Sequence, residues 1–213
     1  MNRIAVPKFA PVRMPRTTLI LLVLCFTGCR AQWQQPDRVI TSLQINPGDR
    51  VADLGAGRGY FVFRLADAVG PQGTVYAVEV TDQKVKTLTE QVQRKGYTNI
   101  QVILGQFQDP LLPDHSIDLV FCCNAYHHIN DRAAYFARLK TDLKPTGRVA
   151  IIDLKRNQTN LLAKLMVPKE HSTPEPLLLE EMTQAGYKPL TTHDFLNEQH
   201  FIIFAPEKNP PAS

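Results

Sequence analysis

The stretch Val51-Ala-Asp-Leu-Gly-Ala-Gly-Arg-Gly-Tyr60 decides the fold of this chain. An apolar run ends in the acid Asp53, and three glycines, Gly55, Gly57 and Gly59, follow at alternate positions before an amphipathic segment begins. This order predicts a buried strand, a tight turn and the start of a helix. Glycine is needed where the backbone takes positive φ or must approach a ligand without a Cβ. Such a turn at the carboxyl end of a strand is where open α/β sheets bind nucleotide-like cofactors.

The spacing of the glycines separates two kinds of cofactor. The dinucleotide fingerprint is G-x-G-x-x-G, whereas this loop has the tighter G-x-G-x-G with Asp53 just before it. A carboxylate at the mouth of the loop repels a pyrophosphate and suits a ligand that carries an ammonium group. The pattern D-x-G-x-G-x-G resembles motif I of the class I S-adenosylmethionine (SAM)-dependent methyltransferases, whose cofactor has an amino-acid end and no phosphate. The resemblance implies a SAM site that contains Asp53, Gly55, Ala56, Gly57 and Gly59.

A second acid follows at the end of the next expected strand. Gly73-Thr-Val-Tyr-Ala-Val-Glu-Val80 is an apolar run that ends in Glu79. An acid at the tip of the second strand can accept hydrogen bonds from the ribose hydroxyls of an adenosine. The run resembles motif II of the same methyltransferases. The resemblance implies that Glu79 is the ribose-binding acid, with Val80 beside it in the cofactor site.

Residues 99–118 resemble the family stretch G-D-A-x-x-L-P-x-x-D-x-S-F-D, which runs from the third strand to the fourth. The family's Asp after the glycine, which accepts from the adenine amino group, is Gln106 in this chain. A glutamine amide oxygen can accept the same hydrogen bond. Phe107 is expected either to pack on the adenine face or to belong to the core, and the sequence leaves both roles open.

The segment Ile117-Asp-Leu-Val-Phe-Cys-Cys-Asn-Ala-Tyr-His-His-Ile129 resembles motif IV, which borders the family's active site. The resemblance implies that Asn124 belongs to the cofactor site. Methyl transfer from a sulfonium is an in-line displacement, and it needs a base only if the acceptor arrives protonated. Histidine suits proton removal near neutral pH, so His128, and after it His127, are the candidate catalytic residues. The alternative is that His127 faces solvent and His128 packs against the next helix.

Cys122, Cys123, His127 and His128 also suggest zinc. Neighbouring strand residues point to opposite faces, and no C-x-x-C spacing supports a closed site. We therefore expect no metal, and no disulfide between the adjacent cysteines.

The remaining pattern predicts an α/β fold with the Rossmann-like class I methyltransferase architecture. This is a mainly parallel seven-stranded sheet with a C-terminal antiparallel hairpin and helices on both faces. A nicotinamide dehydrogenase would more often continue with parallel units, so the ending favours SAM. The strands are expected at 50–54, 74–79, 100–104, 117–122, 147–153, 188–195 and 200–206. The helices are expected at 33–43, 60–70, 82–96, 132–143 and 176–185.

The N-terminal sequence is typical of a targeting signal. Basic residues precede the apolar run Leu19–Phe26, which is too short for a spanning helix of roughly twenty residues. Phe26-Thr-Gly-Cys29 resembles a bacterial lipobox, which implies removal of residues 1–28 and lipidation of Cys29 in an exported lipoprotein. The alternative is a cytoplasmic protein that keeps this segment as a membrane anchor. The expected domains are a signal peptide (1–28), a methyltransferase domain (29–206) and a disordered tail (207–213).

Charge excludes one class of partner. The chain has 24 Lys and Arg against 20 Asp and Glu, and four of the basic residues lie in the leader, so 20 remain against 20. A basic footprint for nucleic acid is therefore absent.

We expect a methyltransferase that acts on a small-molecule or lipid-like acceptor. The alternatives are a non-catalytic protein that binds SAM or another adenosine ligand and, less favoured, a nicotinamide-dependent oxidoreductase. The insert 155–174 is expected to be either a substrate lid or a surface helix that covers the edge of the sheet. The sequence contains no pattern that indicates an oligomeric state.

Overall fold

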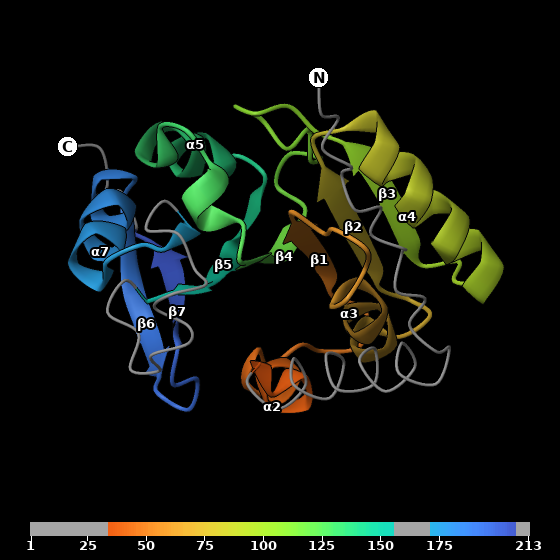
Figure 1. Cartoon of the computed structure of the whole chain (residues 1–213), viewed down its shortest axis with the longest axis horizontal. Coiled ribbons are helices and arrows are strands. Elements are labelled where there is room, and N and C mark those ends of the chain that lie inside the picture. Colours follow the sequence, from red (N-terminus) through yellow and green to blue (C-terminus); the bar gives the residue numbers. More distant parts are fainter. Residues whose placement is uncertain (1–33, 156–170, 208–213) are drawn as a thin grey trace, which may run out of the picture. The chain divides into compact units, whose positions relative to one another are not determined.

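The computed structural model describes residues 34–155 and 171–207 (Figure 1). The expected signal peptide, Cys29 and most of the expected lid and tail lie outside these ranges, so those expectations stay predictions. The strands are β1 (Arg50–Leu54), β2 (Thr74–Glu79), β3 (Ile100–Leu104), β4 (Ile117–Cys123), β5 (Leu143–Leu154), β6 (Tyr187–His193) and β7 (Gln199–Pro206). The helices are α2 (Pro36–Ser42), α3 (Val62–Val69), α4 (Asp82–Lys95), the short 3₁₀ helix η1 (Tyr126–His128), α5 (Arg132–Leu139) and α7 (Glu175–Gln184).

The strands form one seven-stranded sheet in the order β3-β2-β1-β4-β5-β7-β6. β1 to β5 pair in parallel, and β7 runs antiparallel to both β5 and β6. This confirms the predicted Rossmann-like methyltransferase fold. The strand order reverses between β1 and β4, and ligands of open α/β sheets bind beyond the carboxyl ends of the strands at such a point. The glycine loop follows β1 there.

Helices cover both faces of the sheet (Figure 1). Alternate residues of a strand point to opposite faces. Val51 of β1 accordingly packs with α2, α3 and α4 in one core cluster, whereas its neighbour Ala52 packs with α5 and α7 in the other. The buried strands are mostly apolar, as expected for a sheet that is covered on both faces.

The prediction places residues 144–146 between the helix expected at 132–143 and the strand expected at 147–153, whereas the structure includes them in β5. The pairing of β4 with β5 moves from Ile117↔Leu143 to Leu119↔Arg148, so β5 carries extra residues at this point. A bulge of this kind accommodates a Pro-Thr-Gly sequence within a strand, because the extra residues leave the regular ladder of hydrogen bonds.

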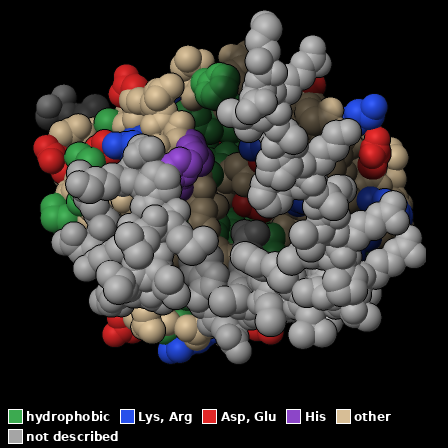
Figure 2. Space-filling view, in the orientation of Figure 1, with side chains coloured by type: hydrophobic (Ala, Val, Ile, Leu, Met, Phe, Trp, Pro, Cys, Tyr) green, Lys and Arg blue, Asp and Glu red, His purple; other side chains and the backbone are tan. Residues whose placement is uncertain are grey.

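On the face seen in Figure 2, the visible acidic and basic side chains are scattered around the rim rather than gathered into one patch. Within residues 34–155 and 171–207, no helix has the length and apolarity that crossing a bilayer requires.

Candidate functional site

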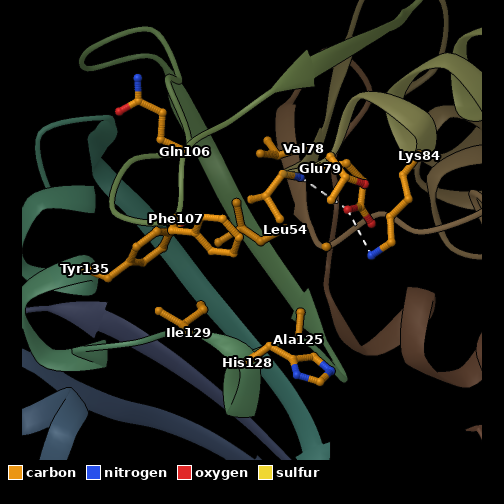
Figure 3. A pocket seen from close by; sticks show the side chains of 13 residues that line it. Leu54, Val78, Glu79, Lys84, Gln106, Phe107, Ala125, His128, Ile129 and Tyr135 are labelled. Atoms are coloured by element: carbon orange, nitrogen blue, oxygen red, sulfur yellow. Dashed lines mark hydrogen bonds and ion pairs between the residues drawn. The ribbon is translucent and has the colours of Figure 1, made fainter.

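A cavity of about 390 Å³ opens at the carboxyl ends of β1 and β2 (Figure 3). The cofactor and catalytic residues expected from the sequence that line it are Gly55, Glu79, Val80, Gln106, Phe107 and His128. The structure therefore brings together residues from four separate stretches of the chain, as expected for a site at the end of a parallel sheet. The cavity wall is mostly apolar, with Leu54, Val78 and Ile129 among its lining residues.

The glycine loop turns sharply above β2. The main-chain NH groups of Gly55 and Ala56 both donate to the carbonyl of Val78, at 3.0 and 3.1 Å. Gly55 has a φ of 72°, and a Cβ there would lie 2.5 Å from the Cβ of Ala125. Only glycine fits at this position, because any Cβ would collide with Ala125. Ala125 follows β4 and lines the same cavity.

Gly57 joins the loop to the second strand. Its main-chain NH donates to Oε1 of Glu79 at 2.6 Å, and the other carboxylate oxygen lies 3.3 Å from Nζ of Lys84 (Figure 3). Glu79 is 2% exposed. A buried carboxylate that borders a cavity and is held by a backbone donor is preorganised to accept hydrogen bonds from a ligand.

Asp53 lies at the end of β1 and is 3% exposed. It does not line the cavity; it lies beneath the loop. Burial, and then the nearby charge of Glu79, raise the pKa of Asp53 from 3.8 to about 8. In the absence of a cation, the protein therefore holds this carboxyl group largely protonated at neutral pH.

Gln106 and Phe107 border the cavity in different ways. The amide of Gln106 points away from the other labelled side chains (Figure 3), although the residue lines the cavity. Phe107 is 58% exposed, which excludes the core role that the sequence left open. Its ring and that of Tyr135 both line the cavity.

Besides Asp53, four of the expected cofactor residues lie off the cavity wall: Ala56, Gly57, Gly59 and Asn124. Ala56 belongs to the core, and a Cβ on Gly59 would meet the ring of Phe63 at 2.7 Å. Asn124 has a φ of 54° and accepts a hydrogen bond from Nε2 of Gln199 at 2.7 Å. These residues shape the loop and the end of β4.

Sequence reasoning missed several cavity residues, including Lys84 and Tyr135. Tyr135 lies within the helix that the sequence predicts at 132–143, and Lys84 lies in the first turn of α4. Their position above the sheet follows from where α4 and α5 begin, which no local motif indicates.

The two candidate histidines have different environments. His128 is exposed and lines the cavity, whereas the side chain of His127 is 5% exposed. Nδ1 of His127 lies 2.7 Å from Oδ1 of Asp153 in β5, so the solvent-facing alternative for His127 is wrong. Burial, and then the charges of His127 and His171, lower the pKa of His128. No local motif indicates that the ring of His171 lies beside these two rings.

Tyr126 contributes to packing rather than to the cavity. It is fully buried, and its hydroxyl donates to Oε2 of Glu181 in α7 at 2.8 Å. Arg132 donates to both oxygens of the same carboxylate at 2.7 Å. This cluster fixes η1, and the histidines it carries, against α5 and α7.

Residues 45–190 match a family model described as a methyltransferase domain. Over 121 residues, the chain is 28% identical to the ubiquinone/menaquinone biosynthesis C-methyltransferase of Teredinibacter turnerae, a match that covers 56% of this chain and 49% of that protein. It is 32% identical over 108 residues to the arsenite methyltransferase of Halobacterium salinarum, covering 51% and 28% of the two chains. The matches thus span about half the length, or less, of these curated relatives.

Solved structures with a similar fold include a SAM-dependent methyltransferase from Aquifex aeolicus. It superimposes with a TM-score of 0.76 at 24% identity, over 82% of this chain and 91% of that chain. An arsenic(III) SAM methyltransferase from Chlamydomonas reinhardtii gives a TM-score of 0.59 at 21% identity, over 78% and 65%. At these identities the likeness concerns the fold.

Proposed function

This chain belongs to the methyltransferase-domain family, and we propose that it transfers a methyl group from SAM to a small-molecule or lipid-like acceptor. The observation that carries the proposal is the pairing of Glu79 with the glycine loop at the mouth of the cavity. The family match supports a methyltransferase, and the geometry supports an adenosine cofactor.

The chemistry of the cavity fits SAM. Gly57 has a φ of 58°, and the nearest atom to a Cβ built there is the carbonyl oxygen of Gly55 at 3.9 Å, so a ligand can approach this backbone closely. Glu79 supplies a fixed acceptor for ribose hydroxyls. Asp53 supplies a buried carboxyl beneath the loop whose ionised form a nearby cation would stabilise, and SAM is cationic where a pyrophosphate is anionic.

Bound SAM supplies an electrophilic methyl group on a sulfonium. The loop and Glu79 hold the cofactor, and the apolar wall around Ile129 excludes water from the space next to it. His128 borders that space, and burial and neighbouring charge keep its imidazole neutral near neutral pH. We propose that His128 accepts the proton of an acceptor that arrives protonated. Full turnover of His128→Ala on the true acceptor would remove His128 from this role.

The cavity wall and the names of the relatives both favour a small, largely apolar acceptor. Leu54, Phe107 and Tyr135 offer apolar and aromatic surface, which suits a ring or an aliphatic group. One relative is named as a C-methyltransferase of ubiquinone and menaquinone biosynthesis, and another as a nocamycin O-methyltransferase. Both names refer to small organic molecules. We propose an acceptor of similar size and apolarity.

Two measurements test the proposal. Isothermal titration with SAM, S-adenosylhomocysteine and NAD is expected to show binding of the first two and none of NAD. A methyl-release assay with labelled SAM and a cell extract then separates an enzyme from a protein that only binds SAM. No affinity for SAM at millimolar concentration overturns the proposal, and tight binding without methyl release favours the binding protein.

We also propose that residues 1–28 direct the chain to the membrane and that Cys29 becomes lipidated. When cells are fractionated, we expect the wild-type chain in the membrane fraction and the Cys29→Ser variant outside it. Mass spectrometry of the mature N-terminus measures the lipid directly. An intact leader on a membrane-bound chain would favour the uncleaved anchor instead.

A further inference from the structure

Three histidine side chains converge beside the cavity. His127 and His128 come from η1, and His171 comes from the segment just before α7. One ring nitrogen from each lies within 4.8 Å of the others. The ring centroids are 4.1, 5.4 and 5.2 Å apart. Figure 2 shows histidine side chains gathered at one place on this face.

A buried carboxylate orients the least exposed of the three rings. Oδ1 of Asp153 lies 2.7 Å from Nδ1 of His127, and Asp153 itself is fully buried. Its other oxygen accepts a hydrogen bond from the hydroxyl of Thr173 at 2.7 Å. With Nδ1 engaged, His127 has Nε2 left to act as a ligand. Histidines that bind metals characteristically donate their other nitrogen to a carboxylate in this way.

We propose that His127, His128 and His171 bind a divalent transition metal ion of the zinc class. Three imidazole nitrogens with a further position open are the ligand set of an accessible zinc site, and imidazole also suits Cu²⁺ and Ni²⁺. Mg²⁺ and Ca²⁺ are excluded as the preferred ions because they require oxygen ligands. The proposal reverses our expectation from the sequence that the chain has no metal site.

The geometry requires a modest rearrangement. Zinc–nitrogen bonds of about 2.0–2.1 Å set the nitrogens of a tetrahedral site about 3.4 Å apart, so the three rings must draw together. His128 and His171 are both exposed, so these two side chains are the ones that would have to turn. His127 is held by Asp153 and serves as the fixed point.

The same residues also connect the metal site to the cavity, because His128 belongs to both. A metal held by His128 borders the space beside the cofactor, and the role of His128 as a base then belongs to the metal-free chain alone. An acceptor with a hydroxyl or thiol next to its methylated position is a suitable further ligand for such a metal. This last step rests on the proposed function, whereas binding of the metal does not.

Titration of the metal-free full-length chain with Zn²⁺, in competition with a chromophoric chelator, tests the proposal. We expect one equivalent of Zn²⁺ to bind with a dissociation constant below about 1 μM, and Co²⁺ to give the visible absorption of a low-coordinate site. His127→Gln and His171→Gln should each weaken binding at least tenfold. The matched control is His115→Asn, which replaces an exposed histidine outside the cluster whose φ is 50°.

Affinity of the wild-type chain weaker than about 100 μM, or equal affinity in His171→Gln and His115→Asn, overturns the metal site. Circular dichroism and thermal unfolding of each variant show whether it is folded. SAM binding to the same metal-free preparation is measured in parallel. Zinc binding without SAM binding would contradict the proposed function alone, and SAM binding without zinc binding would contradict the metal site alone.

Discussion

The main-chain NH of Gly57 donates to Oε1 of Glu79 across 2.6 Å, which ties the loop after β1 to the end of β2. The two residues are far apart in sequence, yet β1 and β2 pair in register so that Leu54 lies beside Val78. The hydrogen bond uses one carboxylate oxygen, and the other accepts from the main-chain NH of Val80 at 3.3 Å and lies 3.3 Å from Nζ of the half-exposed Lys84. A ligand can therefore displace Lys84 without disturbing the loop.

Replacing Glu79 by Gln is expected to weaken SAM binding by about tenfold to a hundredfold, since hydrogen bonds to a charged group contribute about 1.5–3 kcal/mol. The amide oxygen of Gln still accepts from Gly57, so the loop should keep its shape. Titration calorimetry measures the change. The control is Glu90→Gln on the exposed side of α4. Equal affinities of these two variants would show that Glu79 does not contact the cofactor.

Replacing Gly57 by Ala is expected to abolish detectable SAM binding while leaving the chain folded. The φ of 58° costs an alanine about 1–2 kcal/mol, but the added Cβ meets no atom closer than 3.9 Å. The matched control is Gly96→Ala, which has a φ of 73° with nothing within 4 Å and lies at the end of α4. Denaturant unfolding should show similar losses of stability in both. Unchanged SAM affinity in the Gly57 variant would mean that no ligand approaches this backbone.

Sequence patterns predicted the sheet, its antiparallel ending and the acids at the ends of β1 and β2, because hydrophobic periodicity and glycine spacing are local signals. They missed contacts made by residues distant in sequence. The carboxylate of Asp153 reaches His127 only because β4 and β5 lie side by side. His171 joins the same cluster because Thr173 bonds to Asp153. Those contacts depend on tertiary packing, which a single sequence does not display.

Asp53 should give the ligand-free protein a distinct pH dependence. Its pKa is raised from 3.8 to about 8, so between these values the folded chain holds a proton that the unfolded chain has released. The associated stability is fully present below pH 3.8 and is lost as the pH rises through about 8. Asp53→Asn cannot titrate, so its Tm relative to wild type should increase from pH 5 to pH 9. Thermal unfolding at both pH values measures this, and a constant difference would contradict the shifted pKa.

Glu181 should be important for stability rather than for binding. Its carboxylate accepts from the buried hydroxyl of Tyr126 at 2.8 Å and from both donors of Arg132 at 2.7 Å. Glu181→Ala leaves these donors unpaired and should lower the free energy of unfolding by about 2–3 kcal/mol. Glu180→Ala, an exposed neighbour on α7, should change it by less than about 0.5 kcal/mol. Urea unfolding distinguishes the two, and equal losses would show that the cluster contributes little.

The carboxylate of Asp153 acts on the metal through His127 and is a positioning residue. Asp153→Asn keeps the volume of the side chain but removes the charge that fixes the imidazole tautomer. Loss of such a partner typically weakens metal binding by about tenfold to a hundredfold. We therefore expect that reduction in Zn²⁺ affinity, together with a change in the imidazole nitrogen NMR shifts of His127 in the metal-free chain. Asp118→Asn is the control, because Asp118 is also a partly buried strand carboxylate and pairs with Lys144 at 2.6 Å, at the far end of β4. If Asp153 has a merely structural role, Asp153→Asn should behave like the control. It would then lose stability while zinc affinity and the His127 signals stay unchanged.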